Sequence, residues 1–410
     1  MSGFVEETRP IDDCLNFVAG RLGFPWHVPS REERVMDALY SRSSSDVTCP
    51  EPYPPFTRSM RDGYALDHVN TAGASASSPV FLKPAGEVTM GSAPSFRLAD
   101  NEAASIPTGG MLPEGADAVV MAENTSLSGG WVEIRSPAQR GENVMRAAEE
   151  ISSGDILLRK GEVIDRSLPG LLAAFGIISV SIMDICIGVI STGDEIISAE
   201  TPRLPDGFVR DANTFMLQSI LKRYGMRSKS YGIVPDSLEA LRNRSEDAIR
   251  ECGVVLISGG SSVGAMDHTS RLIGELSDQG LLVRGINMTP GKPTLIGGSK
   301  KMEKLIIGLP GHPMSCVVSS IFVAIPLINA MCGSSRRDVG KYCMFPLSED
   351  VPGRTGPDEF IPAIVDKDGV CPIAAKSGYV SAMRNADGFI RLRPDTETLR
   401  KGELAEVWLW

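Results

Sequence analysis

The chain has 410 residues, of which 42% are hydrophobic and 22% charged, a balance typical of a globular protein with roughly two to four domains. Its formal net charge of −10 argues against general nucleic-acid binding, so an anionic substrate needs a local positive charge or a metal ion. Eight scattered cysteines without a C-x-x-C pair, and four histidines without metal-ligand spacing, exclude a zinc site and predict reduced thiols in a cytoplasmic protein.

The first 56 residues predict two helices followed by an extended segment. Helical apolar spacing runs from Ile11 to Gly20 and again from Arg31 to Tyr40. The proline-rich run SDVTCPEPYPPF (45–56) cannot continue a helix, which indicates an extended crossing between lobes. The acidic start MSGFVEETRP lacks an apolar core, so no signal peptide is expected.

The rest of the chain changes character near residues 135 and 180. Short apolar runs cut by Gly, Pro and Asn predict an all-β region over 62–135, and a helix is expected to begin near Leu168. Strands then alternate with helices over 181–332, which predicts a doubly wound α/β domain. The most apolar run, 317–332, is short and carries two serines and a proline, so it predicts a buried helix and no membrane association. Short alternating segments after residue 341 predict a small β-barrel or sandwich.

Three apolar strands of the α/β region run into glycine-rich turns. They are Cys186–Ile190 before STGDE, Val254–Ile257 before SGG, and Leu305–Ile307 before GLPGHP. Because the carboxyl ends of parallel strands meet at one edge of a sheet, these turns are expected to lie together. Glycine lets a phosphate approach the backbone, the acids can hold a divalent cation, and Lys292 adds a positive charge. Any one turn alone is more simply an ordinary connection, but the three together predict a site for a phosphorylated ligand and a metal ion.

Seven strings together resemble molybdopterin molybdenumtransferase, a family shared by bacterial enzymes and the C-terminal domain of gephyrin. In chain order they are SMRDGYA (59–65), IPTGGMLPEGADAVVMAE (106–123), RGENV (140–144), STGDE (191–195), SGGSSVG (258–264), PGKP (290–293) and GLPGHP (308–313). Each string is weak alone, but their shared order over more than half of the chain makes chance similarity very small.

The resemblance implies a multidomain α/β plus β fold. It consists of an elongated linking domain (1–55 and 141–180), an inserted β domain (56–140), a molybdopterin-binding-like α/β domain (181–332) and a C-terminal β domain (333–410). It also implies a homodimer that takes adenylylated molybdopterin and molybdate, inserts the metal with the help of Mg²⁺, and releases AMP with molybdenum cofactor. A molybdopterin adenylyltransferase and cofactor-accepting enzymes are the protein partners that fit this reaction.

Carried over by motif, the resemblance implies a set of site residues. Asp62 and Glu195 are expected to position molybdate or the attacking oxygen, and Asp267 and Lys292 complete the catalytic group. Metal ligands are expected at Glu195, Asp236 and Asp267. From its sequence alone Asp62 reads more simply as an Asp-Gly turn residue, and the resemblance reverses that preference. The expected substrate contacts are Thr108, Ser191, Thr192, Gly193, Asp194, Asp236, Ser258, Gly259, Gly260, Ser262, Gly264, Pro290, Gly291, Pro310, Gly311, His312 and Ser377.

The sequence departs from the family pattern at several positions near the expected anion site. Thr289 stands where a lysine is usual, and His312 stands where many members have asparagine. Loss of a positive charge would weaken anion binding, so two alternatives remain open: a scaffold paralogue that binds molybdopterin without turnover, and a tungstate-preferring insertase. Adenylylation of molybdopterin is a third reading, which the additional β domains fit poorly.

Overall fold

The computed structural model describes residues 8–259, 263–333 and 342–409, with the backbone alone over 263–266. Contacts divide the chain into two compact units. Unit 1 comprises Met1–Ser45, Lys160–Pro169 and Ile178–Trp410, and unit 2 comprises Asp46–Arg159 and Gly170–Ile177. The domain bounds expected from the sequence are finer than this division and stay a prediction.

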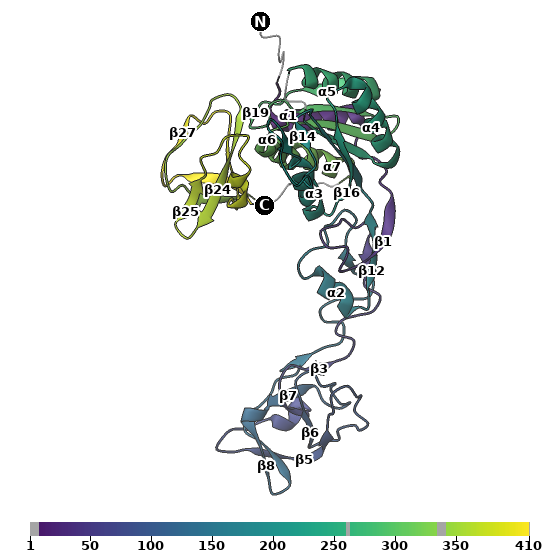
Figure 1. Cartoon of the computed structure of the whole chain (residues 1–410). Coiled ribbons are helices and arrows are strands. Elements are labelled where there is room, and N and C mark those ends of the chain that lie inside the picture. The colour runs from purple at the N-terminus through teal and green to yellow at the C-terminus, as the bar shows by residue number, and fades with distance from the viewer. Residues whose placement is uncertain (1–7, 260–262, 334–341, 410) are drawn as a thin grey trace. The chain divides into compact units, whose positions relative to one another are not determined.

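Unit 1 contains a six-stranded sheet whose first four strands are parallel (Figure 1). The fifth strand runs in the opposite direction, and the sixth pairs antiparallel with the fifth. The doubly wound α/β domain predicted from the sequence is confirmed, with a mixed rather than a parallel sheet. The reversal arises because only four residues, 300–303, join β20 to β21, too few for the crossover that a parallel connection needs. In sheet order the strands are β16 (Arg227–Val234), β13 (Cys186–Thr192), β17 (Val254–Gly259), β21 (Lys304–Leu309), β20 (Leu295–Ser299) and β18 (Leu281–Arg284).

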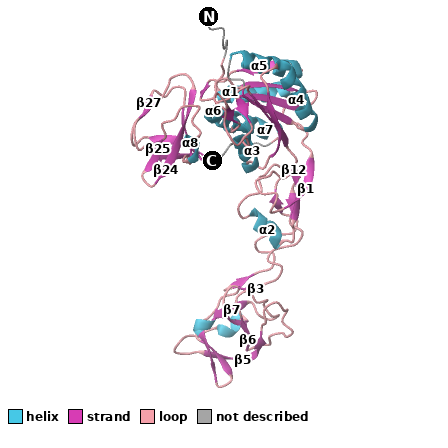
Figure 2. Ribbon diagram, viewed as in Figure 1, coloured by secondary structure: helices cyan, strands magenta, loops and turns pink. Residues whose placement is uncertain are grey.

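Helices cover both faces of this sheet, as Figure 2 shows for the strands in magenta and the helices in cyan. One face packs against α4 (Leu238–Glu251) and α5 (Val263–Leu276). The other packs against α1 (Ile11–Leu22), α3 (Asn213–Arg223) and a long helix over 313–331. Strand residues buried on both faces explain the continuous apolar runs in the sequence.

The long helix consists of α6 (Pro313–Ser319), a π-helical turn η3 (Ser320–Ala324) and α7 (Ile325–Met331). It is long and apolar enough to cross a membrane, but 94% of its most apolar window is buried inside the structure. The predicted buried helix is therefore confirmed. Phe322 in the π-helical turn stacks on Phe360 with ring centroids 4.0 Å apart, which joins this helix to the C-terminal sheet.

The C-terminal β domain predicted from the sequence is a mostly antiparallel six-stranded sheet. One of its strands comes from the α/β region, since Met288 and Thr289 pair in parallel with Asp358 and Glu359. A short helix, α8 (Ser381–Arg384), precedes its fifth strand in chain order. The strands are β19 (Met288–Thr289), β22 (Tyr342–Pro346), β24 (Asp358–Asp366), β25 (Gly369–Pro372), β26 (Gly388–Leu392) and β28 (Leu404–Leu409), with β23 (Val351–Pro352) paired to β27 (Thr398–Leu399).

Unit 2 carries a third six-stranded sheet, which confirms the all-β prediction for 62–135. Its order is β7 (Ala118–Met121), β4 (Gly63–Leu66), β6 (Glu102–Ile106), β5 (Val80–Glu87), β9 (Trp131–Ile134) and β8 (Thr125–Ser128). Short elements complete it: η1 (His68–Thr71), η2 (Ala122–Asn124), β2 (Val47–Thr48) paired with β11 (Ile156–Leu158), and β3 (Arg58–Ser59) paired with β10 (Val144–Met145).

The predicted helix over Arg31–Tyr40 is wrong. Residues Ser30–Arg34 form β1, which pairs antiparallel with β12 (Ser179–Met183), and turns follow up to Tyr40, whose φ is +66°. Residues 31–40 have helical spacing of apolar residues, but the first four of them pair with a strand almost 150 positions away, and this pairing decides their structure. A short window of sequence does not contain the partner strand. The helix expected near Leu168 is confirmed as α2 (Leu168–Ala174).

Candidate active site

The end of β13 carries the first group of predicted site residues. Ser191 and Thr192 are buried there, and Thr192 Oγ1 donates a hydrogen bond to Asp236 Oδ1 at 2.7 Å. The backbone N–H of Asp236 in turn donates to Asp194 Oδ1 at 3.1 Å. Because Asp236 follows β16, the neighbour of β13, these bonds fasten two strand ends together and place both aspartates at one edge of the sheet.

Glu195 belongs to the same edge. A Cβ atom at Gly193 would lie 2.9 Å from Glu195 Oε2, so the carboxylate folds back over the glycine at the end of β13. Its side chain is exposed. The paired strands β14 (Ile196–Ile197) and β15 (Val209–Arg210) follow, with the N–H of Val209 donating to the carbonyl of Glu195 at 2.9 Å. The sheet edge therefore presents carboxylate oxygens to solvent.

Gly259 ends β17 beside Thr192 and has a φ of +130°. A Cβ at this position would lie 1.9 Å from the carbonyl oxygen of Thr192, so only glycine fits between the two strand ends. The neighbouring predicted residues Gly260 and Ser262 lie outside the described residues. Gly264 lies in the first turn of α5.

The turns after β17 and β21 are joined by a residue that the sequence analysis missed. Asn213 Nδ2 donates to Ser258 Oγ at 2.7 Å and to the carbonyl oxygen of Gly311 at 2.8 Å. Asp211 accepts hydrogen bonds from the N–H and Oγ1 of Thr214, the second residue of α3. The only sequence signal was this Asp-x-x-Thr spacing, a helix-start pattern that does not reveal the contacts of Asn213.

The loop from Met288 to Thr294 presents Lys292. Thr294 Oγ1 donates to the carbonyl oxygen of Gly291 at 2.7 Å, and the N–H of Ile286 donates to the carbonyl oxygen of Lys292 at 2.9 Å. The Lys292 side chain is exposed and makes no ion pair with a described residue. Pro290, joined to Thr289 by a cis bond, completes the loop.

His312 and Ser377 bring the C-terminal domain to the GLPGHP turn. Their Nδ1 and Oγ atoms lie 3.0 Å apart, and the N–H of Met314 donates to the carbonyl oxygen of Ser377 at 3.1 Å. Pro310 is buried in the turn before them. A histidine at position 312 therefore acts as a side-chain link between the two domains.

Asp267, another predicted metal ligand, lies near an arginine side chain. It lies in α5 with its side chain 56% exposed, and its Oδ1 is 3.5 Å from Arg284 Nη2. Over the described residues, Glu195, Asp236 and Asp267 do not form a group of three potential ligand atoms within 4.8 Å of one another. Their role as joint metal ligands stays a prediction.

Unit 2 holds the predicted pair Asp62 and Thr108. Asp62 Oδ1 accepts hydrogen bonds from the Thr108 backbone N–H at 2.6 Å and from Thr108 Oγ1 at 2.9 Å. These bonds, the backbone one first, lower the pKa of Asp62 below its ordinary value. Asp62 is therefore held as a carboxylate in a fixed orientation by a residue 46 positions away. Its sequence context alone suggested only an Asp-Gly turn residue.

Replacing Thr108 with valine should raise the pKa of Asp62 part of the way to its ordinary value. The hydroxyl bond is lost, but the stronger backbone bond remains. Since the folded-state pKa lies below the unfolded one, these bonds stabilise the fold above the ordinary pKa and lose that contribution as pH falls through the folded pKa. A carboxyl-carbon NMR titration measures the shift. Thr108→Ser keeps the hydroxyl and should titrate like the wild type; equal titration of the valine variant would contradict the role of the hydroxyl.

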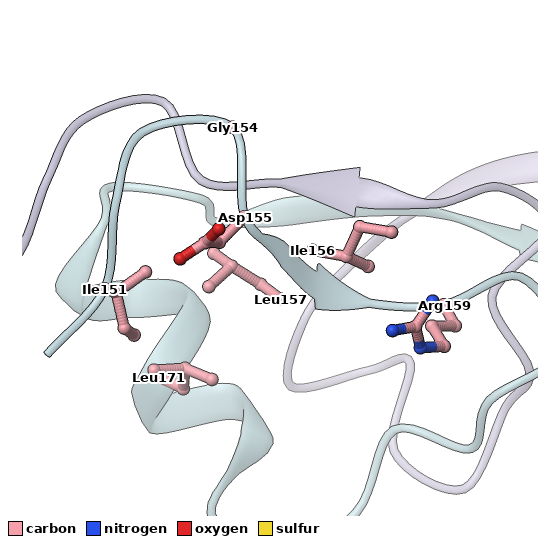
Figure 3. A pocket seen from close by; sticks show the side chains of 7 residues that line it. All are labelled: Ile151, Gly154, Asp155, Ile156, Leu157, Arg159 and Leu171. Carbon is pink, nitrogen blue, oxygen red and sulfur yellow. The ribbon is translucent and has the colours of Figure 1, made fainter.

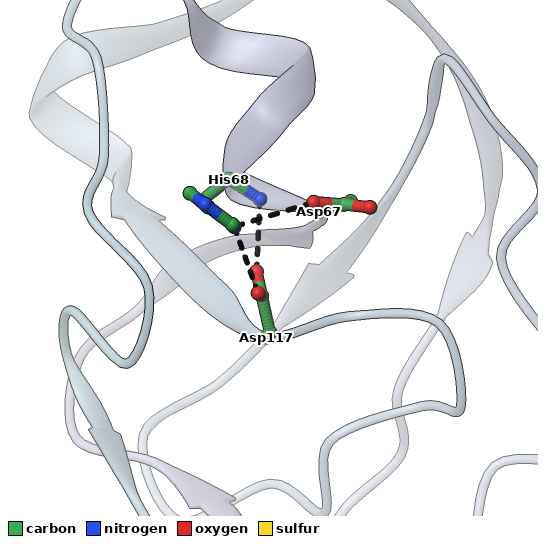
Figure 4. Close-up of side chains that lie close together, drawn as sticks. All are labelled: Asp67, His68 and Asp117. Carbon is green, nitrogen blue, oxygen red and sulfur yellow. Dashed lines mark hydrogen bonds and ion pairs between the residues drawn. The ribbon is translucent and has the colours of Figure 1, made fainter.

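A second cluster in unit 2 consists of Asp67, His68 and Asp117 (Figure 4). His68 Nδ1 lies 2.8 Å from Asp117 Oδ2 and 3.4 Å from Asp67 Oδ1, and the His68 N–H donates to Asp117 Oδ1 at 2.9 Å. Asp67 also accepts from the N–H of Val69 and so caps η1. Arg140 Nε lies 3.6 Å from Asp117 Oδ2. These bonds fasten the end of β4 to the start of β7.

A shallow depression of about 560 Å³ lies elsewhere in unit 2 (Figure 3). None of the site residues predicted from the sequence lines it. Its lining is mainly aliphatic, with Asp155 and Arg159 as the charged side chains; the full lining is Ile151, Gly154, Asp155, Ile156, Leu157, Arg159 and Leu171.

Three family profiles match successive parts of the chain. They are the MoeA N-terminal region (domain I and II) over residues 10–176, a probable molybdopterin binding domain over 188–330, and the MoeA C-terminal region (domain IV) over 345–410. Together they span the strings on which the resemblance rests.

Curated relatives and solved structures agree with these profiles. A molybdopterin biosynthesis protein of Methanocaldococcus jannaschii is 33% identical over 92% of each chain. The molybdopterin molybdenumtransferase of Bacillus subtilis is 28% identical over 91% of this chain and 88% of its own. The crystal structure of a molybdopterin biosynthesis MoeA protein from Pyrococcus horikoshii is 34% identical, covers 98% of this chain and 99% of its own, and superposes with a TM-score of 0.77.

Proposed function

The chain belongs to the MoeA family, and from this premise we propose that it is a molybdopterin molybdenumtransferase of molybdenum cofactor biosynthesis. Its substrates are adenylylated molybdopterin and molybdate, and its products are molybdenum cofactor and AMP. The observation that carries the proposal is the sheet edge at which Asp194, Glu195 and Asp236 lie beside the Gly259 turn. Such an edge, formed by parallel strands, is where α/β proteins bind ligands.

The anionic part of the substrate is recognised by backbone and charge. Glycine at 259 and 291 lets the two turns pack tightly, because a Cβ would lie 1.9 Å from the carbonyl oxygen of Thr192 at the first position and 2.7 Å from Ser319 Oγ at the second. These glycines shape turns whose backbone N–H groups can bind a pyrophosphate. Lys292 is an exposed cation without an ion-pair partner among the described residues, and it can neutralise one phosphate charge. Local attraction of this kind offsets the net charge of −10, which repels an anionic substrate at long range.

The donor set of the edge fits Mg²⁺, which prefers carboxylate oxygens and water. Glu195 and Asp236 would hold the ion at the end of β13, where Thr192 already orients the Asp236 carboxylate by its hydrogen bond. When bound, Mg²⁺ neutralises charge on the phosphates. Glu195 orients the attacking oxygen toward the phosphorus of the pyrophosphate link. Asp62, whose carboxylate is oriented by Thr108 within unit 2, keeps the role that the resemblance implies for it.

The assembly and location follow from the same premise. We propose a cytoplasmic homodimer that receives its pterin substrate from a molybdopterin adenylyltransferase and passes the product to cofactor-accepting enzymes. The scattered cysteines, without a C-x-x-C pair, support a cytoplasmic location.

The deciding experiment mixes the purified protein with adenylylated molybdopterin, Mg²⁺ and either molybdate or tungstate. AMP release and cofactor formation are followed by chromatography, and activation of a cofactor-free reductase reports the finished product. Release that depends on molybdate supports the proposal, and a preference for tungstate changes only the metal. Tight binding without turnover under either oxyanion would overturn it in favour of the scaffold reading.

Replacing Thr289 with lysine should tighten the binding of molybdate several-fold at low ionic strength. Thr289 pairs with Glu359 of β24, whose pKa is raised by burial, so the new ammonium would stand beside a carboxyl group and also lower that pKa. Isothermal titration at two salt concentrations measures the effect, which should weaken as salt rises. Thr289→Gln adds length without charge and should bind like the wild type; equal affinities of all three proteins would count against a charge deficit at position 289.

A further inference from the structure

Asn213, the first residue of α3, ties together two turns of the candidate active site. Its side chain is 6% exposed, and Nδ2 donates to Ser258 Oγ at 2.7 Å and to the carbonyl oxygen of Gly311 at 2.8 Å. Ser258 is the last residue but one of β17, and Gly311 follows β21, the next strand of the sheet. One amide group therefore fixes the spacing between the SGG and GLPGHP turns.

The chemistry of the partners fixes the orientation of this amide. A backbone carbonyl oxygen can only accept a hydrogen bond, so the NH₂ group of Asn213 must face Gly311. The same nitrogen donates to Ser258, which uses both of its hydrogens. Turning the amide over would place two carbonyl oxygens against each other at position 311.

The orientation leaves Asn213 Oδ1 buried without a hydrogen-bond partner among the described residues. Ser191 Oγ, on a side chain only 1% exposed, is unpaired in the same sense. Ser191 is the register partner of Ser258 in the ladder between β13 and β17. Both unpaired atoms therefore belong to neighbours of Ser258, one by strand pairing and the other by a hydrogen bond. Buried polar atoms in folded proteins are nearly always paired, so two exceptions in one place need an explanation other than stability.

We propose that Asn213 is a positioning residue of the transferase reaction, an inference that rests on the proposed function. Its oxygen is closed to solvent, so the amide acts through the two turns rather than by touching substrate. A leucine of similar shape would remove the unpaired Oδ1 but would also take the donor away from the Gly311 carbonyl oxygen and Ser258 Oγ, so we expect the gain and the loss in fold stability to offset one another largely. The fixed spacing of the turns instead holds the pterin–nucleotide substrate in a reactive geometry.

The test compares Asn213→Leu with the wild type in melting temperature, kcat and KM. We expect the melting temperature to change by only a few degrees while kcat/KM for AMP release falls at least tenfold, chiefly through kcat. Asn213→Ser keeps one donor and should be intermediate; it also serves if the leucine variant does not fold. A lower melting temperature with unchanged kcat and KM would assign Asn213 a purely structural role and overturn the inference.

Asn329 provides a matched control in the same unit. It is fully buried in α7, accepts a hydrogen bond from Arg42 Nη2 at 3.1 Å, and has an unpaired Nδ2 among the described residues. Asn329→Leu should lower the melting temperature and leave kcat and KM unchanged, because this residue lies outside the candidate site. Loss of kcat in both leucine variants would show a general effect of removing a buried amide and would overturn the positioning role.

The proposed function and this inference fail in different ways. If the wild-type protein releases no AMP with either oxyanion, the proposed function is wrong. The inference is then decided by the affinity for adenylylated molybdopterin, measured by quenching of the intrinsic fluorescence. At least tenfold weaker binding by Asn213→Leu than by the wild type supports it, and equal binding, or no binding by the wild type, overturns it.

Discussion

Replacing Glu195 with alanine should abolish molybdate-dependent AMP release and leave the affinity for adenylylated molybdopterin within a few-fold of the wild type. The carboxylate lies folded over Gly193 at the end of β13, exposed to solvent, so its removal leaves no cavity. A group that orients the attacking oxygen acts mainly in the transition state, so we expect kcat to fall by roughly 10²–10⁴. Stopped AMP-release assays and fluorescence titration separate the two effects.

Glu200 supplies the control, because it is exposed in the turn after β14 and has no assigned role. Glu200→Ala removes the same charge from the same segment and should keep full activity. Should the Glu195 variant insert metal at the wild-type rate, its assignment as a catalytic residue is wrong. Should it fail to bind the pterin substrate, Glu195 acts in binding and not in the chemical step.

Gly259→Ala should destabilise unit 1 strongly. The new Cβ would lie 1.9 Å from the carbonyl oxygen of Thr192, and the φ of +130° is one that side-chain-bearing residues rarely adopt. The two strand ends must separate, which we expect to cost about 3 kcal/mol or more in free energy of unfolding. The melting temperature of the domain should fall by roughly 6–10 °C, measured by calorimetry.

Gly253, at the opposite end of β17, provides a matched comparison. A Cβ there meets no atom within 4 Å, and its φ is compatible with alanine. Gly253→Ala should therefore leave the melting temperature nearly unchanged. A small effect at position 259 as well would mean that the ends of β13 and β17 can move apart at little cost, which contradicts a rigid ligand-binding edge.

Much of the α/β domain could be predicted because its strands are buried on both faces. The runs Cys186–Ile190, Val254–Ile257 and Leu305–Ile307 therefore read as continuous apolar segments, and each ends where the structure ends it within two residues. The segment 31–34 could not be predicted in this way. Its strand is mostly exposed and exists because Ser179–Met183 pairs with it, so its own side chains carry no strand signal.

The residue types of the candidate site could be predicted from the sequence, but the hydrogen bonds between those residues could not. Glycines at three strand ends, with two acids in the STGDE turn, predict an anion and metal site at one edge of the sheet. The hydrogen bonds that arrange them join residues far apart in sequence: 46 positions for Asp62 and Thr108, 98 for Asn213 and Gly311, and 65 for His312 and Ser377. No local pattern encodes such pairs, which is why Asn213 was missed.

The long helix over 313–331 has a consequence for how the chain is made. Outside its finished domain, this segment has the apolar character of a membrane span. Every strand of the sheet that covers it ends before residue 310, and α1 and α3 are earlier still. During synthesis from the N-terminus, most of the surface that receives the helix is therefore already translated when the helix emerges, and only the C-terminal contacts such as Phe360 and Phe389 follow. This order of elements along the chain shortens the time during which an exposed apolar nascent segment can aggregate or insert into a membrane.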